Sequence, residues 1–307
     1  MPHHVVMSNA AASVVDHAAH TAFSDPGAHA GLLDALPTDP AALSEVARNV
    51  IAHYRAFQSQ LPEATRGDIN ARWLRVILET DQARHPSPLV EPRELSERVQ
   101  GCCRDHTLLC VGALRQHGIP ARSRVGFAGY FTEGFHHDHV IVEAWIDGRW
   151  RRFDPEVGEP LPGLPTPHDM SLEAAASSGF TTAAEAWLAY RRGEVDGSTY
   201  GVHPDVPELC GPGFLVGEVI YEVAHRFGDE LLLWDGWGRI GPPDQPVADE
   251  DASWTDEIAE LLLAADAGDL EAERRLLERY RRDPDLHPGA EVMTLDPFGG
   301  APARVTL

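Results

Sequence analysis

An alternating strand followed by an Asp-Gly pair constrains the chain more strongly than any other stretch. Apolar residues occupy every second position over 140–146, and Asp147-Gly148 follows directly. Asp-Gly between alternating segments is typical of a two-residue β-hairpin turn, so residues 149–153 are expected to return as an antiparallel strand. The predicted hairpin places Asp154 beside His139, although the two residues lie far apart along the chain.

A helix is predicted ahead of this hairpin, over residues 103–117. Its apolar side chains recur at steps of three and four residues, and Gly118 and Pro120 provide a stop signal. Cys103 therefore opens the helix, where unpaired N–H groups and the helix dipole favour an anion. We expect this position to lower the pKa of the Cys103 thiol. The same N–H groups are expected to form an oxyanion site, with Gln100 as a candidate side-chain donor.

A cysteine, a histidine and an aspartate in this arrangement suit nucleophilic catalysis. Cys103 is the candidate nucleophile, His139 is the candidate base, and Asp154 is the candidate group that orients the histidine. A carboxylate beside an imidazole fixes its tautomer and stabilises the imidazolium that forms when the base takes a proton. Cys102 is the alternative candidate for the nucleophile. Whichever of the two adjacent cysteines is not the nucleophile is expected to be a small buried residue.

Four short motifs resemble, in sequence and order, the core of the bacterial transglutaminase-like superfamily. They read G-C-C-R-D, G-I-P-A-R, D-H-V-I-V-E-A-W and W-R-R-F-D-P. The resemblance implies an α+β protein with a papain-like fold, in which the cysteine helix packs on an antiparallel sheet and further helices are added at both ends. It assigns the Cys-His-Asp triad to Cys103, His139 and Asp154, because Arg104-Asp105 follows Cys103 as the pattern requires. Segments outside the core are more weakly similar to an uncharacterised cytoplasmic branch of that superfamily.

A triad of this kind supports cysteine-dependent acyl transfer through a thioester. With an amine acceptor the reaction is that of a transglutaminase or amide-forming acyltransferase, and with water it is that of a hydrolase such as an amidase, deamidase or peptidase. The expected partners are a small-molecule or peptide acyl donor and an amine acceptor, and the oligomeric state is left open. The alternative is a non-catalytic binding or scaffold module that uses the same fold with an idle triad.

A histidine-rich run leaves a third, metal-dependent possibility open. Its members are His136, His137, Asp138 and His139. Strand alternation places His137 and His139 on one face, and histidine and aspartate are common metal ligands. The triad hypothesis accounts for Cys103 and Asp154 together with His139, whereas the metal hypothesis does not. We therefore expect neither a functional metal nor another cofactor.

The composition restricts the partners and the compartment. The 307 residues carry a formal net charge of −23 and are 43% hydrophobic, as in an ordinary globular protein. A surface this acidic repels nucleic acid and anionic membranes, and it either favours amine-bearing partners or simply maintains solubility. The N-terminal residues lack the layout of a signal peptide, and no apolar run is long enough to cross a membrane. No disulfide framework is visible among Cys102, Cys103, Cys110 and Cys210, so we expect a cytoplasmic protein.

Four consecutive parts are predicted along the chain. They are an N-terminal helical cap (1–90), a transglutaminase-like catalytic core (91–165), a helical extension that closes the core (166–245), and a C-terminal helical hairpin with a tail (246–307). Apolar periodicity predicts a strand pair or one long bent strand over 121–131 and helices over 41–61, 68–83, 171–192, 214–227, 253–267 and 269–282. The Pro- and Gly-rich tail after residue 283 is expected to lie over the surface or to be mobile.

Three residues in the predicted strands have alternative roles. Tyr130 and Phe131 either line the site or belong to the core. Glu143 lies on the same strand face as the candidate base. It tunes that base, binds substrate, or forms a salt bridge with Arg122 or Arg124. We favour the salt bridge.

A tryptophan-rich segment and a lone histidine complete the candidates. The segment Trp234–Trp237 either borders the acceptor site, with Asp235 or Glu230 holding a cationic group, or anchors the preceding helix to the core. We favour the anchor, since buried tryptophan packs more often than it binds. His53 is expected to be an ordinary helix histidine in the core or at the surface.

Overall fold

A five-stranded sheet lies at the centre of the molecule, whose computed structural model describes residues 13–170 and 179–307. The strands are β3 (Ala121–Thr132), β4 (Phe135–Ile146), β5 (Arg149–Phe153), β6 (Phe180–Thr182) and β7 (Tyr200–Gly201). Four of them run in the order β5-β4-β3-β6 with antiparallel neighbours, and β7 pairs in parallel with the start of β4.

The hairpin predicted from the sequence joins β4 to β5. Asp147-Gly148 adopts φ angles of 53° and 77°, the left-handed pair that a type I′ turn needs to match the twist of the two strands. The register places Val142 opposite Phe153, so Asp154 follows the end of β5 close to His139. The expected α+β class, with the cysteine helix packed on an antiparallel sheet, is confirmed.

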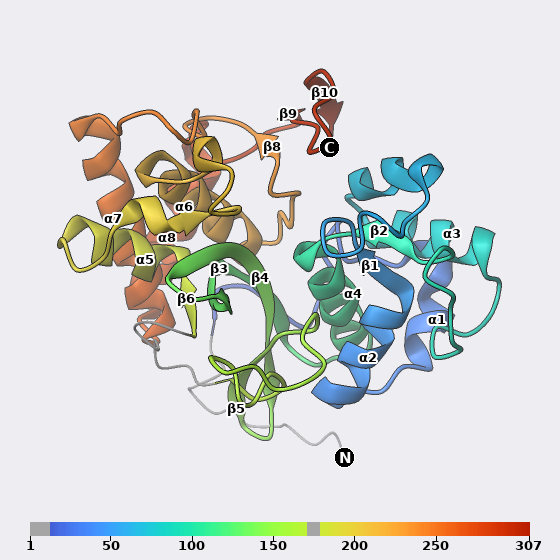
Figure 1. Ribbon diagram of the computed structural model, residues 1–307. Helices are drawn as coiled ribbons and strands as arrows, with labels where there is room; N and C mark the ends of the chain where they lie inside the picture. Colours follow the sequence, from blue (N-terminus) through green and yellow to red (C-terminus); the bar gives the residue numbers. More distant parts are fainter. Residues whose placement is uncertain (1–12, 171–178) are drawn as a thin grey trace, which may run out of the picture.

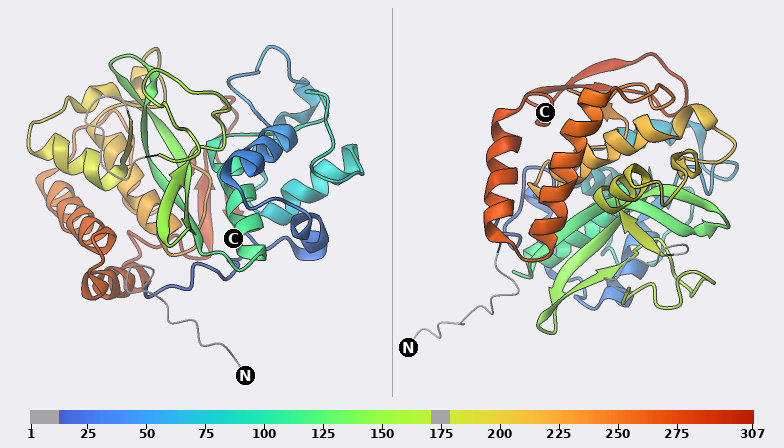
Figure 2. Two further views of the ribbon diagram at one scale, coloured as in Figure 1. Left: turned by 90° about the horizontal axis from the view of Figure 1, so that it is seen from below. Right: turned by 90° about the vertical axis from the view of Figure 1, so that its left-hand side faces the viewer.

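Helices cover both sides of the sheet (Figures 1 and 2). Those numbered α1 to α4 lie on one side of β3 and β4, and those numbered α5 to α8 lie on the other. The first set is α1 (Ala30–Asp34), α2 (Pro40–Val50), α3 (Leu74–Arg84) and α4 (Cys103–Gln116). The second set is α5 (Ala183–Arg191), α6 (Pro212–Arg226), α7 (Asp249–Asp266) and α8 (Leu270–Arg282). Short 3₁₀ segments are η2 (Gly27–His29), η3 (Glu63–Asn70), η4 (Gly197–Thr199) and η5 (Pro207–Leu209).

The predicted helix over 41–61 ends early. After α2 the chain forms β1 (Ile51–His53), which pairs in parallel with β2 (Val99–Gly101). The prediction is wrong for this segment because pairing with a strand far along the chain overrides local helical propensity. The register places His53 opposite Gly101, and so beside the start of α4.

The predicted helix over 68–83 is interrupted. Its first residues belong to η3, α3 begins only at Leu74, and Arg72 lies between the two elements. The Arg72 side chain is 4% exposed and donates to both carboxylate oxygens of Asp235, at 3.0 and 2.6 Å. A break in the helix at this point allows the guanidinium to turn inward and reach its partner.

The helical elements of the second half agree better with the sequence. Residues 171–178 of the predicted helix over 171–192 lie outside the described part of the chain. The next residues form strand β6, and the rest of the predicted helix corresponds to α5. The predictions over 214–227 and 269–282 are confirmed by α6 and α8. The predicted helix over 253–267 begins too late, since α7 starts at Asp249.

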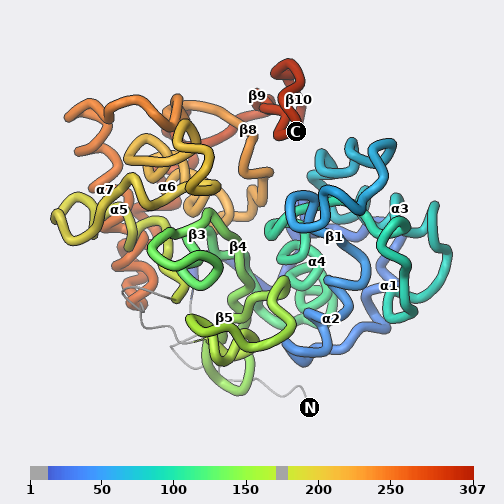
Figure 3. Tube along the Cα trace, in the orientation of Figure 1, coloured from blue at the N-terminus to red at the C-terminus, as the bar shows by residue number. Residues whose placement is uncertain are grey.

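The C-terminal residues form more structure than the sequence predicts. Helices α7 and α8 pack side by side as the expected hairpin (Figure 2). Beyond them, a small antiparallel sheet joins β8 (Asp235–Gly236), β9 (Glu291–Thr294) and β10 (Ala303–Thr306). The Cα trace in Figure 3 shows this sheet at the top of the molecule, beyond α6. The tail therefore contains paired strands.

The segment Trp234–Trp237 acts as an anchor. Asp235 faces the buried Arg72, and Glu230 pairs with the buried Arg115 at 2.7 Å. The possibility that either carboxylate holds a cationic ligand is therefore wrong, because each already has an arginine of the chain as its partner.

One buried apolar cluster extends from Phe23 to Val292 and includes residues from each of the four predicted parts, whose boundaries stay predictions. The four cysteines are all unpaired, as expected. Within residues 13–170 and 179–307, no helix combines the length and the apolarity that crossing a bilayer requires.

Replacing Asp235 with alanine would leave Arg72 buried without a counter-charge. Breaking a buried ion pair costs about 3–5 kcal/mol, so the free energy of unfolding measured in urea should fall by roughly that amount. The exposed pair of Glu63 and Arg66, 2.8 Å apart, provides the control. Glu63→Ala should change the free energy by no more than about 0.5 kcal/mol, and an equally small loss in Asp235→Ala would contradict the prediction.

Candidate active site

The first turn of α4 is fixed by its own capping residue. Asp105 accepts a hydrogen bond from the Cys102 N–H at 2.8 Å, and this bond caps the N-terminus of the helix. A side chain at Gly101 would collide with this cap, since a Cβ there would lie 2.7 Å from the Asp105 carboxylate. The cap thus explains the glycine and the aspartate of the Gly-Cys-Cys-Arg-Asp motif, and it fixes where Cys103 begins the helix.

The arginine of the same motif ties this turn to distant segments. Arg104 is 1% exposed, and its guanidinium donates to Asp105 at 2.8 Å and to the Glu230 carbonyl at 2.9 Å. It also donates to the Arg72 carbonyl. The start of α4 is therefore held by the segment before α3 and by the segment after α6 at once.

The thiol of Cys103 is nearly enclosed. Only 5% of the residue is exposed, and the Cys102 thiol lies within hydrogen-bond reach. That hydrogen bond, burial, and the nearby Glu156 and Asp138 carboxylates raise the pKa of Cys103 well above its usual range. The expected lowering of this pKa is therefore wrong, because these contributions outweigh the helix dipole.

His139 and Asp154 meet as the hairpin predicts. Nε2 of His139 lies 2.8 Å from Oδ2 of Asp154, and the Tyr130 hydroxyl donates to the same oxygen at 2.6 Å. Burial lowers the pKa of His139, but the charge and hydrogen bond of Asp154 more than offset it, so the pKa is raised. Burial raises the pKa of Asp154, yet His139 and Tyr130 hold it below its usual range. Since Asp154 binds Nε2, Nδ1 is the atom of His139 left to accept a proton.

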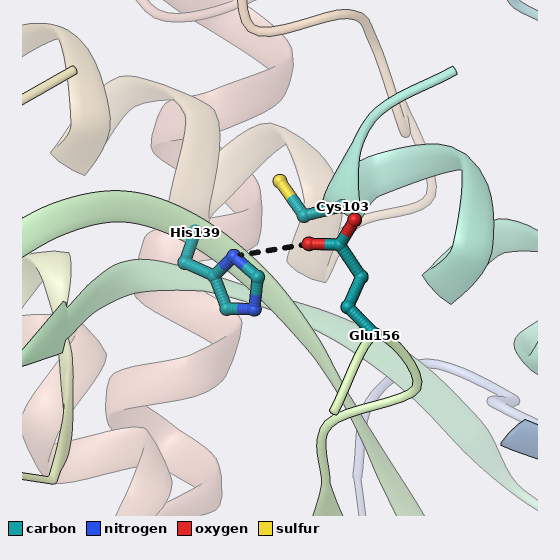
Figure 4. Close-up of side chains that lie close together, drawn as sticks. All are labelled: Cys103, His139 and Glu156. Atoms are coloured by element: carbon teal, nitrogen blue, oxygen red, sulfur yellow. Dashed lines mark ion pairs between the residues drawn. The ribbon is translucent and has the colours of Figure 1, made fainter. Parts of the chain in front are cut away.

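A second carboxylate, Glu156, faces Nδ1 of His139 (Figure 4). Its oxygen lies 3.8 Å from Nδ1. The sulfur of Cys103, a ring nitrogen of His139 and an oxygen of Glu156 all lie within 4.8 Å of one another. Glu156 was not predicted from the sequence, although its two-residue spacing from Asp154 at the end of a strand indicates that both side chains turn to one side.

His106 lies on the far side of Glu156, at 3.3 Å from Nδ1 to the carboxylate. Its two ring nitrogens also face backbone carbonyls, Nδ1 that of Cys102 at 2.8 Å and Nε2 that of Ile51 at 3.2 Å. All these partners are hydrogen-bond acceptors, so the N–H of the His106 ring has an acceptor at either nitrogen. His106 follows Cys103 by one helical turn, and this spacing was the signal for it.

His53 completes the ring of histidines around Glu156. Its Nδ1 accepts from the N–H groups of Arg55 and Ala56 at 3.3 and 3.4 Å, so its proton is on Nε2, which lies 3.9 Å from the carboxylate. Burial lowers the pKa of His53, and the charge of Glu156 opposes this. The sequence placed His53 in a helix, and only the pairing of β1 with β2 brings it to the site.

Residues of β3 and β4 border the His139 ring. Phe131 packs its edge on this ring, with 5.1 Å between ring centres, and remains 43% exposed. Tyr130 is buried and reaches Asp154, so both aromatic residues border the site. Asp138 lies next to His139 in β4, and burial raises its pKa to about 6 against the opposing charge of Arg55.

Comparison with known proteins agrees with this geometry. Residues 54–155 match the model of the family described as the Transglutaminase-like superfamily. The chain contains a transglutaminase-like domain. The match covers about a third of the chain and includes Cys103, His139 and Asp154, whereas His53 and Glu156 lie just outside it.

Other comparisons add little to the transglutaminase-like assignment. No curated protein matches the chain significantly. A similar solved structure is that of a "Putative Cysteine Protease" from Cytophaga hutchinsonii, which is 20% identical, with a TM-score of 0.31 over 54% of this chain and 50% of that chain. The chain thus spans about half the length of that protein, and a likeness this weak carries no argument about function.

Two further expectations about the transglutaminase-like domain have clear outcomes. Gln100 donates its amide to the Pro62 carbonyl and the Thr65 hydroxyl, both at 2.7 Å, so it is not available to an oxyanion. Glu143 forms the expected salt bridge with Arg122 (Nε to carboxylate 2.6 Å). That the N–H groups at the start of α4 receive an oxyanion stays a prediction.

The histidine-rich run does not converge on a metal site. His136 stacks on Tyr200, with 4.3 Å between ring centres, and His137 bonds the Val202 carbonyl and the Thr132 hydroxyl. Among the residues that the structure describes, the one group of three side chains close enough to share an ion is Cys103, His139 and Glu156.

Removing the charge of Glu156 should activate the thiol. In Glu156→Gln the carboxylate no longer raises the pKa of Cys103, so alkylation by iodoacetamide at a fixed neutral pH should be severalfold faster than in the wild type. Stopped alkylation with peptide mapping of Cys103 gives the rate. Glu159→Gln, at an exposed position of the same loop, serves as the control and should leave it unchanged. A slower rate in Glu156→Gln would show that the carboxylate assists the thiolate.

The pair of His139 and Asp154 should stabilise the fold in a defined pH window. The pKa of Asp154 is depressed, so its contribution is present above the unfolded value of about 3.9 and is lost as pH falls. The pKa of His139 is raised, so its contribution is complete below about 6.5 and is lost as pH rises through the folded value. Both contributions are present together between about pH 4 and 6.5.

Urea denaturation of Asp154→Asn tests this window. Its free energy of unfolding should fall below that of the wild type by a larger margin near pH 5.5 than near pH 9, values chosen on either side of the histidine titration at about 6.5. The exposed pair of His203 and Asp205, at 3.7 Å, provides a matched control, and Asp205→Asn should show no such margin. A margin for Asp154→Asn that does not change with pH would contradict the pairing.

Proposed function

We propose that this chain catalyses cysteine-dependent acyl transfer through a thioester formed on Cys103. The observation that carries the proposal is the orientation of His139, whose Nε2 is bound to Asp154 at 2.8 Å while Nδ1 faces Glu156 and a ring nitrogen lies within 4.8 Å of the Cys103 sulfur. An imidazole held in this way can take the thiol proton and later return it. The transglutaminase-like domain over residues 54–155 supports cysteine-dependent chemistry in general.

The proposed steps use the atoms in a fixed order. Nδ1 of His139 takes the proton of Cys103 as the sulfur forms a bond to the acyl carbon, and the carbonyl electrons move to oxygen. The N–H groups at the start of α4 receive this oxyanion. The carbonyl re-forms, the leaving amine, alcohol or thiol departs with the proton from His139, and the acyl group remains on sulfur. The acceptor then loses a proton to His139, attacks the thioester, and releases Cys103, which regains the proton.

Activation of the thiol is proposed to accompany the attack. The raised pKa of Cys103 disfavours a thiolate that exists before substrate arrives. The raised pKa of His139 makes its imidazole a better proton acceptor. Asp154 stays charged because its pKa is depressed, and it compensates the imidazolium as the proton moves. We therefore propose general-base activation by His139, with Asp154 as its positioning residue.

The acceptor is proposed to be an amine in preference to water. Asp138 and Glu156 add negative charge beside Cys103, and the chain as a whole has a net charge of −23. Such a field raises the local concentration of a protonated amine, which can pass its proton to a carboxylate before it attacks. The acyl donor is proposed to be a small molecule or a peptide, and the four unpaired cysteines suit a reducing, cytoplasmic environment.

One observation favours a second candidate, a non-catalytic binding module. Cys103 is 5% exposed and His139 is 2% exposed, so a substrate reaches them only after the surrounding residues move. A module of this kind would keep the triad geometry without turnover. The two candidates predict opposite results for the reactivity of Cys103 with small electrophiles.

Limited alkylation separates the two candidates. Brief treatment of the whole chain with substoichiometric iodoacetamide, followed by intact mass and peptide mapping, should label Cys103 before Cys110 and Cys210. In His139→Ala the labelling rate should fall by about 10²–10⁴-fold, the usual contribution of a general base. His203→Ala, which alters an exposed histidine, should leave the rate unchanged. Labelling of Cys102 instead, or no preference for Cys103, would favour the binding module.

Acyl donors then identify the reaction. Glutamine peptides and simple thioesters are supplied with and without a primary amine, and mass spectrometry follows amide, free acid and the acyl-enzyme at Cys103. Amide formation that exceeds release of acid supports an amine acceptor, whereas acid alone assigns the chain to the hydrolases. Cys103→Ser should abolish both products. Product formation that survives this variant would contradict the proposed thioester.

A further inference from the structure

We propose that Cys103, His139 and Glu156 form a binding site for a soft divalent cation such as zinc, and that the bound cation switches the thiol off. The three side chains come from three separate elements, the start of α4, β4 and the loop after β5, yet their donor atoms lie within 4.8 Å of one another. Sulfur, imidazole nitrogen and carboxylate oxygen are the donor types that zinc takes in proteins.

The spacing of the donors suits a tetrahedral ion. Zinc–ligand distances of about 2.0–2.3 Å place any two tetrahedral ligands roughly 3.5 Å apart. Nδ1 of His139 and the Glu156 carboxylate are already 3.8 Å apart. Figure 4 shows Cys103 and Glu156 on the same side of the His139 ring, and the three donor atoms lie within 4.8 Å of one another.

The imidazole is already oriented as a metal ligand requires. A metal-bound histidine usually donates its second ring N–H to a carboxylate, which fixes the tautomer and raises the basicity of the ligand. Asp154 accepts from Nε2 of His139 at 2.8 Å and is held in place by the Tyr130 hydroxyl at 2.6 Å. The lone pair of Nδ1 is thereby directed toward the proposed ion.

The charge balance favours the cation. A Cys103 thiolate and the Glu156 carboxylate together neutralise a divalent ion, and Asp138 adds further negative charge nearby. Binding breaks the S–H bond, forms a sulfur–metal bond, and releases one proton to solvent.

The surrounding histidines leave one position of the ion open. Both ring nitrogens of His106 lie against backbone carbonyls, so neither is directed at the proposed ion. The Nε2 of His53 carries its proton and lies 3.9 Å from Glu156, where it supports the carboxylate. A fourth position is therefore left for water, as in other zinc sites with three protein ligands.

Occupation of this site excludes acyl transfer, because the ion uses the sulfur lone pair that attacks the substrate and the Nδ1 lone pair that accepts the proton. This regulatory role rests on the proposed function, whereas the cation site itself does not. Loss or removal of the ion would restore the thiol. The site would thus couple activity to the supply of free soft cations.

Cobalt(II) is the probe for the site, because it replaces zinc and gives visible and charge-transfer bands when bound to a thiolate. Titration of the metal-free whole chain should give a thiolate–cobalt band and tetrahedral d–d bands, which added zinc displaces. The bands should vanish in Cys103→Ser, and in Glu156→Gln the affinity should fall by at least about tenfold. Cys210→Ala and Glu159→Gln should bind as the wild type does, and circular dichroism shows that each variant is folded.

Alkylation of Cys103 with and without zinc tests the switch. Zinc should protect Cys103 in the wild type, a chelator should reverse the protection, and Glu156→Gln should need at least about tenfold more zinc for the same effect. Cobalt bands that persist in Cys103→Ser, or zinc that leaves alkylation unchanged, would overturn the proposal. So would acyl transfer that requires the ion.

The two proposals fail separately. Thiolate–cobalt bands without any acyl transfer in the metal-free chain would support the cation site and sink the proposed function. Acyl transfer with no cobalt band would sustain the function and overturn the cation site.

Discussion

The buried network of Arg104 and Asp105 at the first turn of α4 holds the rest of the structure together. Asp105 caps the helix through the Cys102 N–H, and Arg104 reaches carbonyl oxygens of two distant segments, including that of Glu230 at 2.9 Å. A buried arginine is stable only when its donors are satisfied, so these segments must assemble around it together. The position of the reactive thiol is thus a product of long-range packing and not of the helix alone.

The electrostatics of the site depend on how two carboxylates are placed around one imidazole. Asp154 binds Nε2 directly and favours the imidazolium, as its influence on the pKa of His139 shows. Glu156 faces Nδ1 at 3.8 Å and stands beside the thiol, so it favours the imidazolium but disfavours the thiolate. Two charges 4 Å apart interact by about 4 kcal/mol at an effective dielectric constant of 20. This repulsion adds to the hydrogen bond from Cys102 and to burial, which together keep the thiol neutral in spite of its position at a helix N-terminus.

The parts of the site that the sequence predicted are those that depend on local geometry. The Asp147-Gly148 turn requires antiparallel strands, and these bring His139 to Asp154 whatever the rest of the chain does. Helix α4 follows in the same way from its apolar period and its stop signal. The contribution of His53 was not predictable, because it depends on a parallel pairing between β1 and β2, which are separated by many residues. Local propensity carries no information about such a pairing.

The sign of the Cys103 pKa shift shows why a motif alone does not define a nucleophile. A helix N-terminus favours a thiolate by roughly 0.3–1 kcal/mol at an exposed site, whatever residues surround the thiol. Burial acts in the opposite direction and can shift a thiol strongly toward its neutral form. Glu156, one residue beyond the matched family region, adds to burial. What arrives next to Glu156 therefore decides the state of the sulfur. Either a cationic substrate group or a bound metal cation would offset the negative charge that disfavours the thiolate. With the substrate group, Nδ1 of His139 remains free to move a proton, whereas with the metal cation it does not.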